Sequence, residues 1–216
     1  MGIDARDKKF VIAIGRQYGS GGREIGRMVA DMLGVKYYDK ELLIEAAKAS
    51  GVKTEFFEAA DERSPRLFRN LWSFNLGYNP SSFLVGGSGV GDEAIYQAQS
   101  EVMRGLAQAS SCVIVGRSAD YVLRDHQRLI SVFIHSSIEA RVARIMARSG
   151  VASPAKAREI AEKRDKLRAS YYNFYTDKTW GASSSYDLSV DSSKLPTERV
   201  ARVIVDYVTA RLEADD

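Results

Sequence analysis

The sequence contains few of the side chains on which metal and redox sites usually depend. Of its 216 residues one is cysteine, Cys112, and two are histidine, His126 and His135. A single cysteine excludes an intramolecular disulfide framework and a cysteine metal cluster, and it makes a cytoplasmic location the default expectation. With only two histidines, we expect neither a histidine-based metal site nor a catalytic triad, and no metal ligands are assigned.

Long apolar runs are also missing. The first one, Phe10–Ile14, is followed at once by Gly15, so it is too short for a signal sequence or a membrane span. The formal net charge is +3 and the isoelectric point is about 8.9, which is too mild to predict nucleic-acid binding by itself. We therefore expect no membrane partner and no nucleic-acid partner, and the composition leaves the oligomeric state open.

Glycine is concentrated directly after the first apolar run. Gly15, Gly19, Gly21 and Gly22 precede a segment with helical apolar spacing that ends at Leu33. This order predicts a strand, a tight loop and a helix, in which unpaired N–H groups and the helix dipole favour an anion. Phosphate is the natural ligand of such a loop. The alternative is a strand-to-helix turn that binds nothing.

The loop departs from the usual phosphate-binding pattern, Gly-x-x-x-x-Gly-Lys-Ser/Thr, because Gly22 stands where the lysine is expected. Arg16 and Arg23 are the nearby cations that can replace it, and arginine can fork across two phosphate oxygens. Glu24 can orient a magnesium-bound water or cap the helix. The residues expected to bind the donor phosphates are Arg16, Gly19, Ser20, Gly21, Gly22, Arg23 and Glu24.

Strands and helices alternate along most of the chain, which predicts a parallel sheet covered on both faces. The five expected strands are Phe10–Ile14, Val35–Tyr38, Cys112–Val115, Leu129–His135 and Tyr186–Val190. Helices are expected after Lys40, from Asp92 to Ala109, after a capping box at Ser136–Glu139, and after Ser153 and Pro154. Gly34 and Gly150 are the expected ends of two helices.

Two charged residues stand where predicted strands end. Asp39 follows the second strand, and Arg117 follows Gly116 at the end of the third. The carboxyl ends of parallel strands are where ligands bind in such sheets. The alternatives are a helix cap for Asp39 and a surface salt bridge for Arg117.

Positive charge is concentrated late in the chain. The segment 141–168 contains nine basic and three acidic residues, although the whole chain carries only +3. Arg164 and Arg168 lie four residues apart on one helix face and can neutralise a phosphoryl group in transfer. By contrast, the segment 52–91 contains no predicted strand, and its second half is typical of a lid, a binding loop or a disordered segment.

Several of these pieces, in this order, resemble the cytidylate kinase-like family of nucleoside monophosphate kinases. The residues that carry the resemblance are Ile12–Ile14, Gly19–Gly21, Tyr38, Asp39, Gly116, Arg117, Phe133–Arg141, Arg164, Asp165, Arg168 and Tyr186–Leu188. The resemblance implies an α/β fold of the P-loop NTPase type, with three α/β/α layers and a five-stranded parallel sheet. It implies one domain over 1–216, with a core at 8–51, 92–149 and 186–214, a helical acceptor-binding insertion at 52–91 and a helical lid at 150–185.

The resemblance also implies ATP and Mg²⁺ as cofactors and ATP-dependent phosphorylation of a nucleoside monophosphate, cytidylate-like, or a related small acceptor. The expected catalytic residues are Arg23, Arg164 and Arg168. The expected acceptor residues are Asp39, Arg117 and Asp120, the last because the family has aspartate where this chain has Ser118. Two alternatives stay open: a nucleotide sensor without efficient catalysis, and a kinase of a non-nucleotide molecule.

Overall fold

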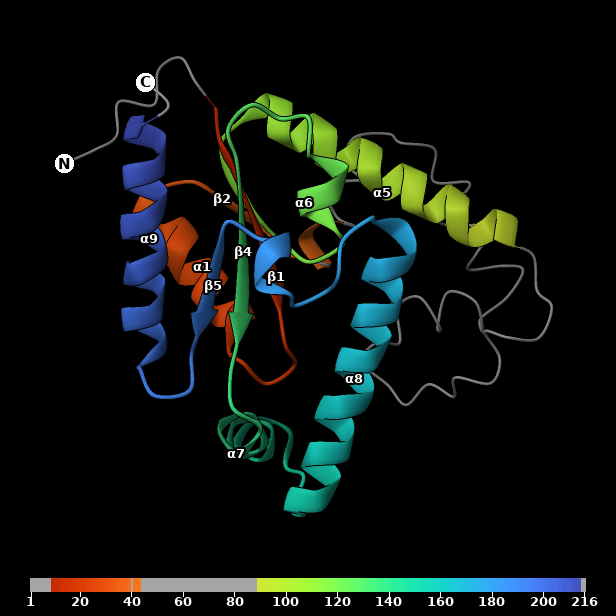
Figure 1. Ribbon diagram of the computed structural model, residues 1–216, viewed down its shortest axis with the longest axis vertical. Helices are drawn as coiled ribbons and strands as arrows, with labels where there is room; N and C mark the ends of the chain where they lie inside the picture. The colour runs from red at the N-terminus through yellow and green to blue at the C-terminus, as the bar shows by residue number, and fades with distance from the viewer. Residues whose placement is uncertain (1–8, 40, 44–88, 215–216) are drawn as a thin grey trace.

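The computed structural model describes residues 9–39, 41–43 and 89–214, which form a parallel sheet between two layers of helices (Figure 1). Its strands are β1 (Val11–Arg16), β2 (Lys36–Tyr38), β3 (Cys112–Val115), β4 (Leu129–His135) and β5 (Leu188–Asp191). They lie in the order β2-β3-β1-β4-β5, and every neighbouring pair is parallel. The prediction of a five-stranded parallel sheet with three α/β/α layers is confirmed.

The helices of the described residues follow the expected alternation. They are α1 (Gly22–Leu33), α5 (Gly89–Ala109), α6 (Ala119–Val122), α7 (Ile138–Ser149), α8 (Pro154–Tyr175) and α9 (Thr197–Ala214), with a short 3-10 helix, η3, at Ser183–Ser185. The predicted stops are confirmed, because Gly34 and Gly150 both have left-handed φ values of 66°. Most of the helix expected after Lys40 and of the insertion at 52–91 lies outside the described residues.

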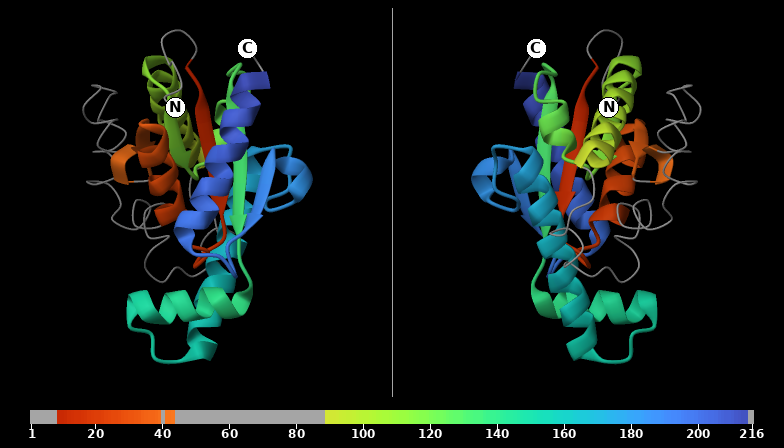
Figure 2. Two further views of the ribbon diagram at one scale, coloured as in Figure 1. Left: turned by 90° about the vertical axis from the view of Figure 1, so that its left-hand side faces the viewer. Right: turned by 90° about the vertical axis from the view of Figure 1, so that its right-hand side faces the viewer.

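Alternate residues of the central strands face the two helical layers. Ile12 and Ile14 of β1 belong to the core under α1 and α9, whereas Val11 and Ala13 belong to the core under α5 and α6. Figure 2 shows these layers on opposite sides of the sheet. Because β1 and β3 are buried on both faces, they read as continuous apolar runs in the sequence.

Strand β1 continues two residues beyond the predicted run. Its pairing with β4 extends to Gly15 opposite Phe133 and to Arg16 opposite Ile134. The carboxyl edge of the sheet therefore begins at Arg16, and the glycine loop starts directly above it.

The predicted capping box of α7 is wrong by one residue. Ser137, not Ser136, caps the helix, and its hydroxyl accepts a hydrogen bond from the Ala140 N–H at 3.3 Å. Ser136 instead accepts from Arg144 Nη1 at 3.1 Å, and its hydroxyl lies 3.3 Å from that of Ser193. The cap of α8 is confirmed, since Ser153 accepts from the Lys156 N–H and Pro154 begins the helix.

Helices α7 and α8 extend beyond the carboxyl edge of the sheet and pack on each other (Figure 1). Ile145 of α7 and Ala157 and Ala161 of α8 form the small core between them. The predicted lid, residues 150–185, contains α8 and η3, and its closure over a ligand stays a prediction. Among the described helices, none is both long enough and apolar enough to cross a membrane.

The packing of α9 on the sheet gives a test of the fold. Ile204 is completely buried in the core under α9, whereas its neighbour Val203 is 44% exposed. We expect Ile204→Ala to lower the free energy of unfolding by about 2–5 kcal/mol, because it leaves a cavity in a packed core. The matched change Val203→Ala should alter it by less than about 0.5 kcal/mol. Urea unfolding measures both, and equal effects would contradict the described packing.

Candidate active site

A cavity of about 360 Å³ lies at the carboxyl edge of the sheet, between the β1–α1 loop, the end of β3 and α8. Most of the residues assigned from the sequence line it: Arg16, Gly19, Gly21, Gly22, Arg23, Asp39, Arg117, Asp120 and Arg168. Ser20, Glu24 and Arg164 are not part of its lining. Of the described residues, six arginines and three carboxylates line the cavity, so its charge favours an anionic ligand.

Two glycines and a buried serine give the β1–α1 loop its shape. Gly19 and Gly21 have φ values of 82° and 81°, which lie in the left-handed region that favours glycine. Between them, the Ser20 hydroxyl donates to the Gln17 carbonyl at 2.9 Å and accepts from the Gly22 N–H at 3.3 Å. Ser20 is fully buried, so it holds the loop together rather than facing the cavity.

The loop leaves amide groups free at the start of α1. Within the described residues, the N–H groups of Gly19 and Gly21 have no acceptor. The first bond of the helix runs from the Ile25 N–H to the Gly21 carbonyl at 3.0 Å, and amides that precede such a bond lack intrahelical partners. These donors, with the positive end of the helix dipole, form a cradle that suits phosphate.

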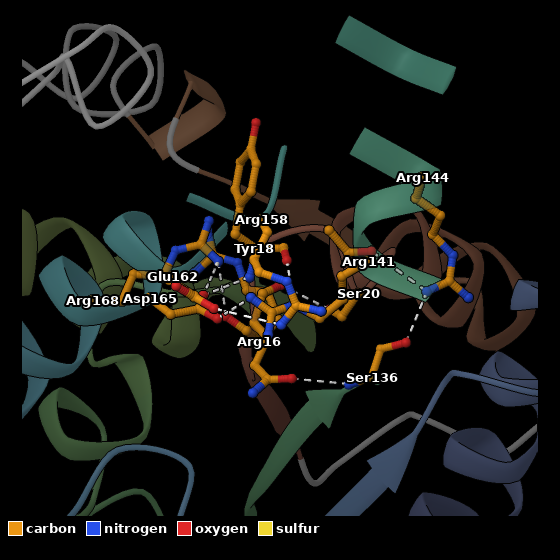
Figure 3. Close-up of polar contacts among 12 residues, drawn as sticks. Arg16, Tyr18, Ser20, Ser136, Arg141, Arg144, Arg158, Glu162, Asp165 and Arg168 are labelled. Atoms are coloured by element: carbon orange, nitrogen blue, oxygen red, sulfur yellow. Dashed lines mark hydrogen bonds and ion pairs between the residues drawn. The ribbon is translucent and has the colours of Figure 1, made fainter. Parts of the chain in front are cut away.

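Arg16 lies between this loop and the end of β3 (Figure 3). A Cβ added to Gly116 would lie 2.2 Å from its Nη1 atom, so the guanidinium rests directly on that glycine. In the described part of the chain the guanidinium has no hydrogen bond or ion pair. Burial, followed by the charges of Arg168 and Arg117, lowers the pKa of Arg16 to about 9. A bound anion would offset these costs.

Arg23, the other candidate to replace the lysine, is engaged by carboxylates. Its Nε donates to Asp39 Oδ2 at 2.8 Å, and its Nη2 forms an ion pair with Glu41. The buried Asp39 also accepts from the N–H groups of Glu41 and Leu42 at 3.1 and 3.2 Å. Asp39 is therefore both a cap for the following turn and a residue of the cavity wall.

Glu24 does not line the cavity itself, although its ion-pair partner Arg148 does. It forms an ion pair with Arg148 of α7 and accepts from the Thr197 hydroxyl at 3.0 Å. It stands in the first turn of α1, but Gly21 is the N-cap residue. Its contacts tie the start of α1 to α7 and α9, and its place in the first turn is one where the helix dipole favours a carboxylate. Its role at a magnesium-bound water stays a prediction.

Strand β3 ends in a strained turn. The φ values are 86° at Gly116, 61° at Arg117 and 52° at Ser118, and the last two are costly for residues with a side chain. This turn brings Arg117 to the cavity wall, where its guanidinium has no partner among the described residues. The Ser118 hydroxyl is buried without a hydrogen-bond partner. Both groups are therefore available to a ligand.

Asp120 joins the same wall through the first turn of α6. It is 6% exposed, and its Oδ2 accepts from the Tyr172 hydroxyl at 2.6 Å. Lys178 Nζ lies 3.8 Å from the same oxygen. Burial raises the pKa of Asp120, against the opposing effects of these two neighbours. The cavity thus has a carboxylate whose orientation is set by a tyrosine of α8.

The two arginines predicted on one face of α8 have different surroundings. Arg168 lines the cavity, and its Nη1 donates to the Arg16 carbonyl at 2.9 Å. Burial lowers the pKa of Arg168 to about 10. Arg164 lies outside the cavity lining with its guanidinium 4.4 Å from the centre of the Tyr18 ring. The shared helix face is confirmed, but Arg168 alone of the pair reaches the cavity.

Sequence reasoning gave no role to Arg141 or Asp165, although both contact the loop. The Asp165 carboxylate accepts from the Tyr18 N–H across 147 residues of sequence, at 2.7 Å. The signal available in the sequence was that Asp165 is an acidic residue in a strongly basic segment and directly follows Arg164, which was expected to be catalytic. Tyr172 was also missed, because its position in an aromatic run predicts packing rather than a bond to Asp120.

The described residues fit phosphate better than a preformed metal site. Among them, no group of three or more His, Cys, Asp or Glu side chains could hold a metal ion. Mg²⁺ in kinases is held largely by substrate phosphates and water, with one or two carboxylates. Asp39 and Glu41 line the cavity and offer such carboxylates. The free amides and arginines provide for the phosphates.

Comparison with solved structures indicates the class of protein. The chain is 28% identical to an uncharacterized protein from Eubacterium ventriosum ATCC 27560, with a TM-score of 0.69, covering 93% of this chain and 99% of that one. A gluconokinase from Sinorhizobium meliloti 1021 shares the fold, with a TM-score of 0.55, 17% identity and 97% of each chain covered. The sheet order and the glycine loop are those of the P-loop kinase-type fold.

The particular family follows from the sequence. The model of the cytidylate kinase-like family matches residues 11–194, so the chain belongs to that family. It is also 25% identical, over 203 residues and 94% of both chains, to the cytidylate kinase of Pyrobaculum aerophilum. The resemblance drawn from the motifs is confirmed, and the protein is a nucleotide kinase-type phosphotransferase.

The turn after β3 gives a test of the site. Gly116→Ala should lower the free energy of unfolding by about 1–2 kcal/mol, because alanine is strained at a φ of 86°, and it should displace the Arg16 guanidinium. Gly105→Ala in α5 is the matched control, since an added Cβ there meets nothing within 4 Å. It should be neutral or stabilising by up to about 1 kcal/mol. Thermal unfolding of both variants measures the difference, and a neutral Gly116→Ala would contradict the strained turn.

Proposed function

We propose that this protein transfers the γ-phosphoryl group of ATP to a nucleoside monophosphate, cytidylate-like, or to a related small anionic acceptor. The observation that carries the proposal is the combination of free amides at Gly19 and Gly21 with the unpartnered guanidinium of Arg16. Phosphoryl transfer depends on positioning and charge neutralisation more than on a covalent catalyst. Family membership supports the reaction class, and the cavity supports the ligand charge.

On the donor side, the loop amides bind the phosphate oxygens and Arg16 supplies the charge that the missing lysine usually provides. Arg168 stands beside Arg16 and neutralises charge on the transferring group, with Arg164 behind it. Arg23 is a further cation that can contact the phosphates once its ion pairs with Asp39 and Glu41 are broken. When bound, Mg²⁺ supplies further neutralisation of the phosphates, and Asp39 and Glu41 are the carboxylates placed to hold it.

On the acceptor side, Arg117 binds the anionic group of the acceptor. The Ser118 hydroxyl can donate or accept a hydrogen bond to its polar groups, and the nearby Asp120 carboxylate can accept one. Asp39 also lines the cavity, at the end of β2, the strand that pairs with β3. An acceptor bound on this wall would face the γ-phosphoryl group, whose oxygens Arg16 and Arg168 neutralise during transfer.

One observation favours a second function, a nucleotide sensor without efficient catalysis. Arg23 is held by two carboxylates, and the loop lacks both the lysine and the hydroxyl that usually follow the last glycine. Such a protein would bind ATP and change shape without turning it over. The two functions share the donor site, so only turnover separates them.

The acceptor is tested with a coupled ADP-release assay using MgATP and a panel of nucleoside monophosphates, nucleosides, gluconate and shikimate. We expect turnover with at least one monophosphate, and with cytidylate first. Turnover with a non-nucleotide acceptor alone would contradict a nucleotide acceptor and assign the protein to the kinases of that substrate class. ATP binding by calorimetry without turnover for any acceptor would establish the sensor. Absence of both binding and turnover would mean that the loop is a plain turn.

The two candidate arginines are ranked by substitution. Arg16→Ala should lower kcat by about 100- to 1000-fold, the usual effect of losing one preorganised charge contact. Arg23→Ala should have a smaller effect, because Arg23 is already neutralised. Arg104→Ala, at an exposed position of α5, is the control and should change nothing. The reverse ranking would assign the role to Arg23, and small equal effects would assign it to Arg164 and Arg168.

A further inference from the structure

The peptide groups on either side of Tyr18, in the middle of the glycine loop, are held by the two helices beyond the sheet. The Tyr18 N–H donates to Asp165 Oδ1 of α8 at 2.7 Å. The Tyr18 carbonyl accepts from Arg141 Nε of α7 at 2.8 Å. The ring of contacts is closed by an ion pair between Arg141 Nη2 and Asp165 Oδ2 (Figure 3).

These groups are largely removed from water. The side chains of Arg141 and Asp165 are 7% and 13% exposed. The charges that face the Asp165 carboxylate come from α7 and from α8 itself, where Arg168 Nη1 lies 3.9 Å from Oδ1. A carboxylate in this position is satisfied by one amide and one guanidinium, and both belong to the contact with the loop.

Neighbouring residues of α7 and α8 make further contacts with the backbone of the loop. Arg168 of α8 donates to the carbonyl of Arg16 at 2.9 Å. Arg144 of α7 lies 3.4 Å from the carbonyl of Gly19. A Cβ at Gly19 would meet the Arg141 carbonyl at 3.0 Å, so α7 lies directly against the loop backbone. The backbones of three residues, Arg16, Tyr18 and Gly19, are therefore bound to α7 or α8.

We propose that Asp165 of α8, in the predicted lid, and Arg141 of α7 are positioning residues that couple the phosphate-binding loop to these two helices. They turn the Tyr18 N–H away from the centre of the loop, so that the amides of Gly19 and Gly21 remain for the donor phosphates. Because both helices hold the same residue, filling the loop with phosphate restrains α7 and α8 as well. The catalytic consequence rests on the proposed function, but the coupling itself does not.

A purely structural role of Asp165 and Arg141 predicts a different experimental result. A buried ion pair is weak support for stability, and breaking one destabilises mainly because it leaves an unpaired charge. If Asp165 and Arg141 served stability alone, their loss would lower the unfolding temperature and leave the ATP affinity of the remaining folded protein unchanged. A positioning role instead lowers the ATP affinity of protein that is fully folded.

The test uses the full-length protein and two matched substitutions on α8. Asp165→Asn keeps the size and one acceptor for the Tyr18 N–H, but its amide nitrogen opposes the Arg141 guanidinium, donor against donor. Glu162→Gln removes a carboxylate one turn away that is 62% exposed and 3.8 Å from Arg158, and it is the control. Far-ultraviolet circular dichroism and thermal unfolding establish that both variants are folded.

The readouts are MgATP affinity by calorimetry and hydrogen exchange with and without MgATP. We expect Asp165→Asn to weaken MgATP binding by about 10- to 100-fold, because small displacements of positioned groups have effects of that size. In the wild type and in Glu162→Gln, MgATP should slow exchange in both the loop, 16–22, and the helices, 138–175. In Asp165→Asn at saturating MgATP, protection should persist in the loop and disappear from the helices.

Unchanged affinity and unchanged helix protection in folded Asp165→Asn would overturn the inference and leave the pair a structural one. The proposed function fails separately, if the wild type binds no MgATP and phosphorylates nothing. In that case exchange without nucleotide decides the coupling. Faster exchange of both 16–22 and 138–149 in Asp165→Asn supports it, and exchange equal to that of Glu162→Gln overturns it.

Discussion

The parallel pairing of β1 with β3 on one side and β4 on the other is the constraint on which the site depends. Ile14 pairs with Val115, and Arg16 pairs with Ile134, so three strands end at one edge in register. The glycine loop, the turn at Gly116 and the start of α7 therefore meet without any long connection. A slip of one residue would exchange the two faces of each strand and bury the wrong set of side chains. The hydrophobic core and the candidate site are consequences of the same register.

Much of this arrangement was predictable, because it depends on local patterns. Apolar runs alternating with helical spacing give the layers, and glycines at the ends of Phe10–Ile14 and Cys112–Val115 mark the ligand edge. The rest depends on contacts between distant residues. Nothing in the sequence shows that Arg23 pairs with Asp39 and Glu41 while Arg16 does not, since both arginines are equally close to the loop. The prediction of the N-cap residue of α7 was wrong for a simpler reason. Two adjacent serines both suit the position, and Ser136 is instead bound to Arg144.

The missing lysine changes how charge reaches the phosphates. A lysine after the last glycine extends from the helix start and is mobile, whereas Arg16 comes from the strand below and rests on Gly116. A guanidinium fixed in this way offers several donors in one plane, at the cost of being less adjustable. The hold of α7 and α8 on Tyr18 is consistent with this, because a fixed cation is useful only if the loop above it is fixed too.

The concentration of positive charge has a thermodynamic consequence. Arg16, Arg117 and Arg168 lie around one cavity, and burial and mutual repulsion both oppose the protonated state of Arg16. The folded chain without a ligand therefore carries an unfavourable electrostatic energy that the unfolded chain does not. Any anion that enters the cavity relieves it and shifts the folding equilibrium by mass action. On the proposed function, buffer composition becomes a variable of this protein's stability, and phosphate or sulfate in the medium is expected to act as a weak ligand.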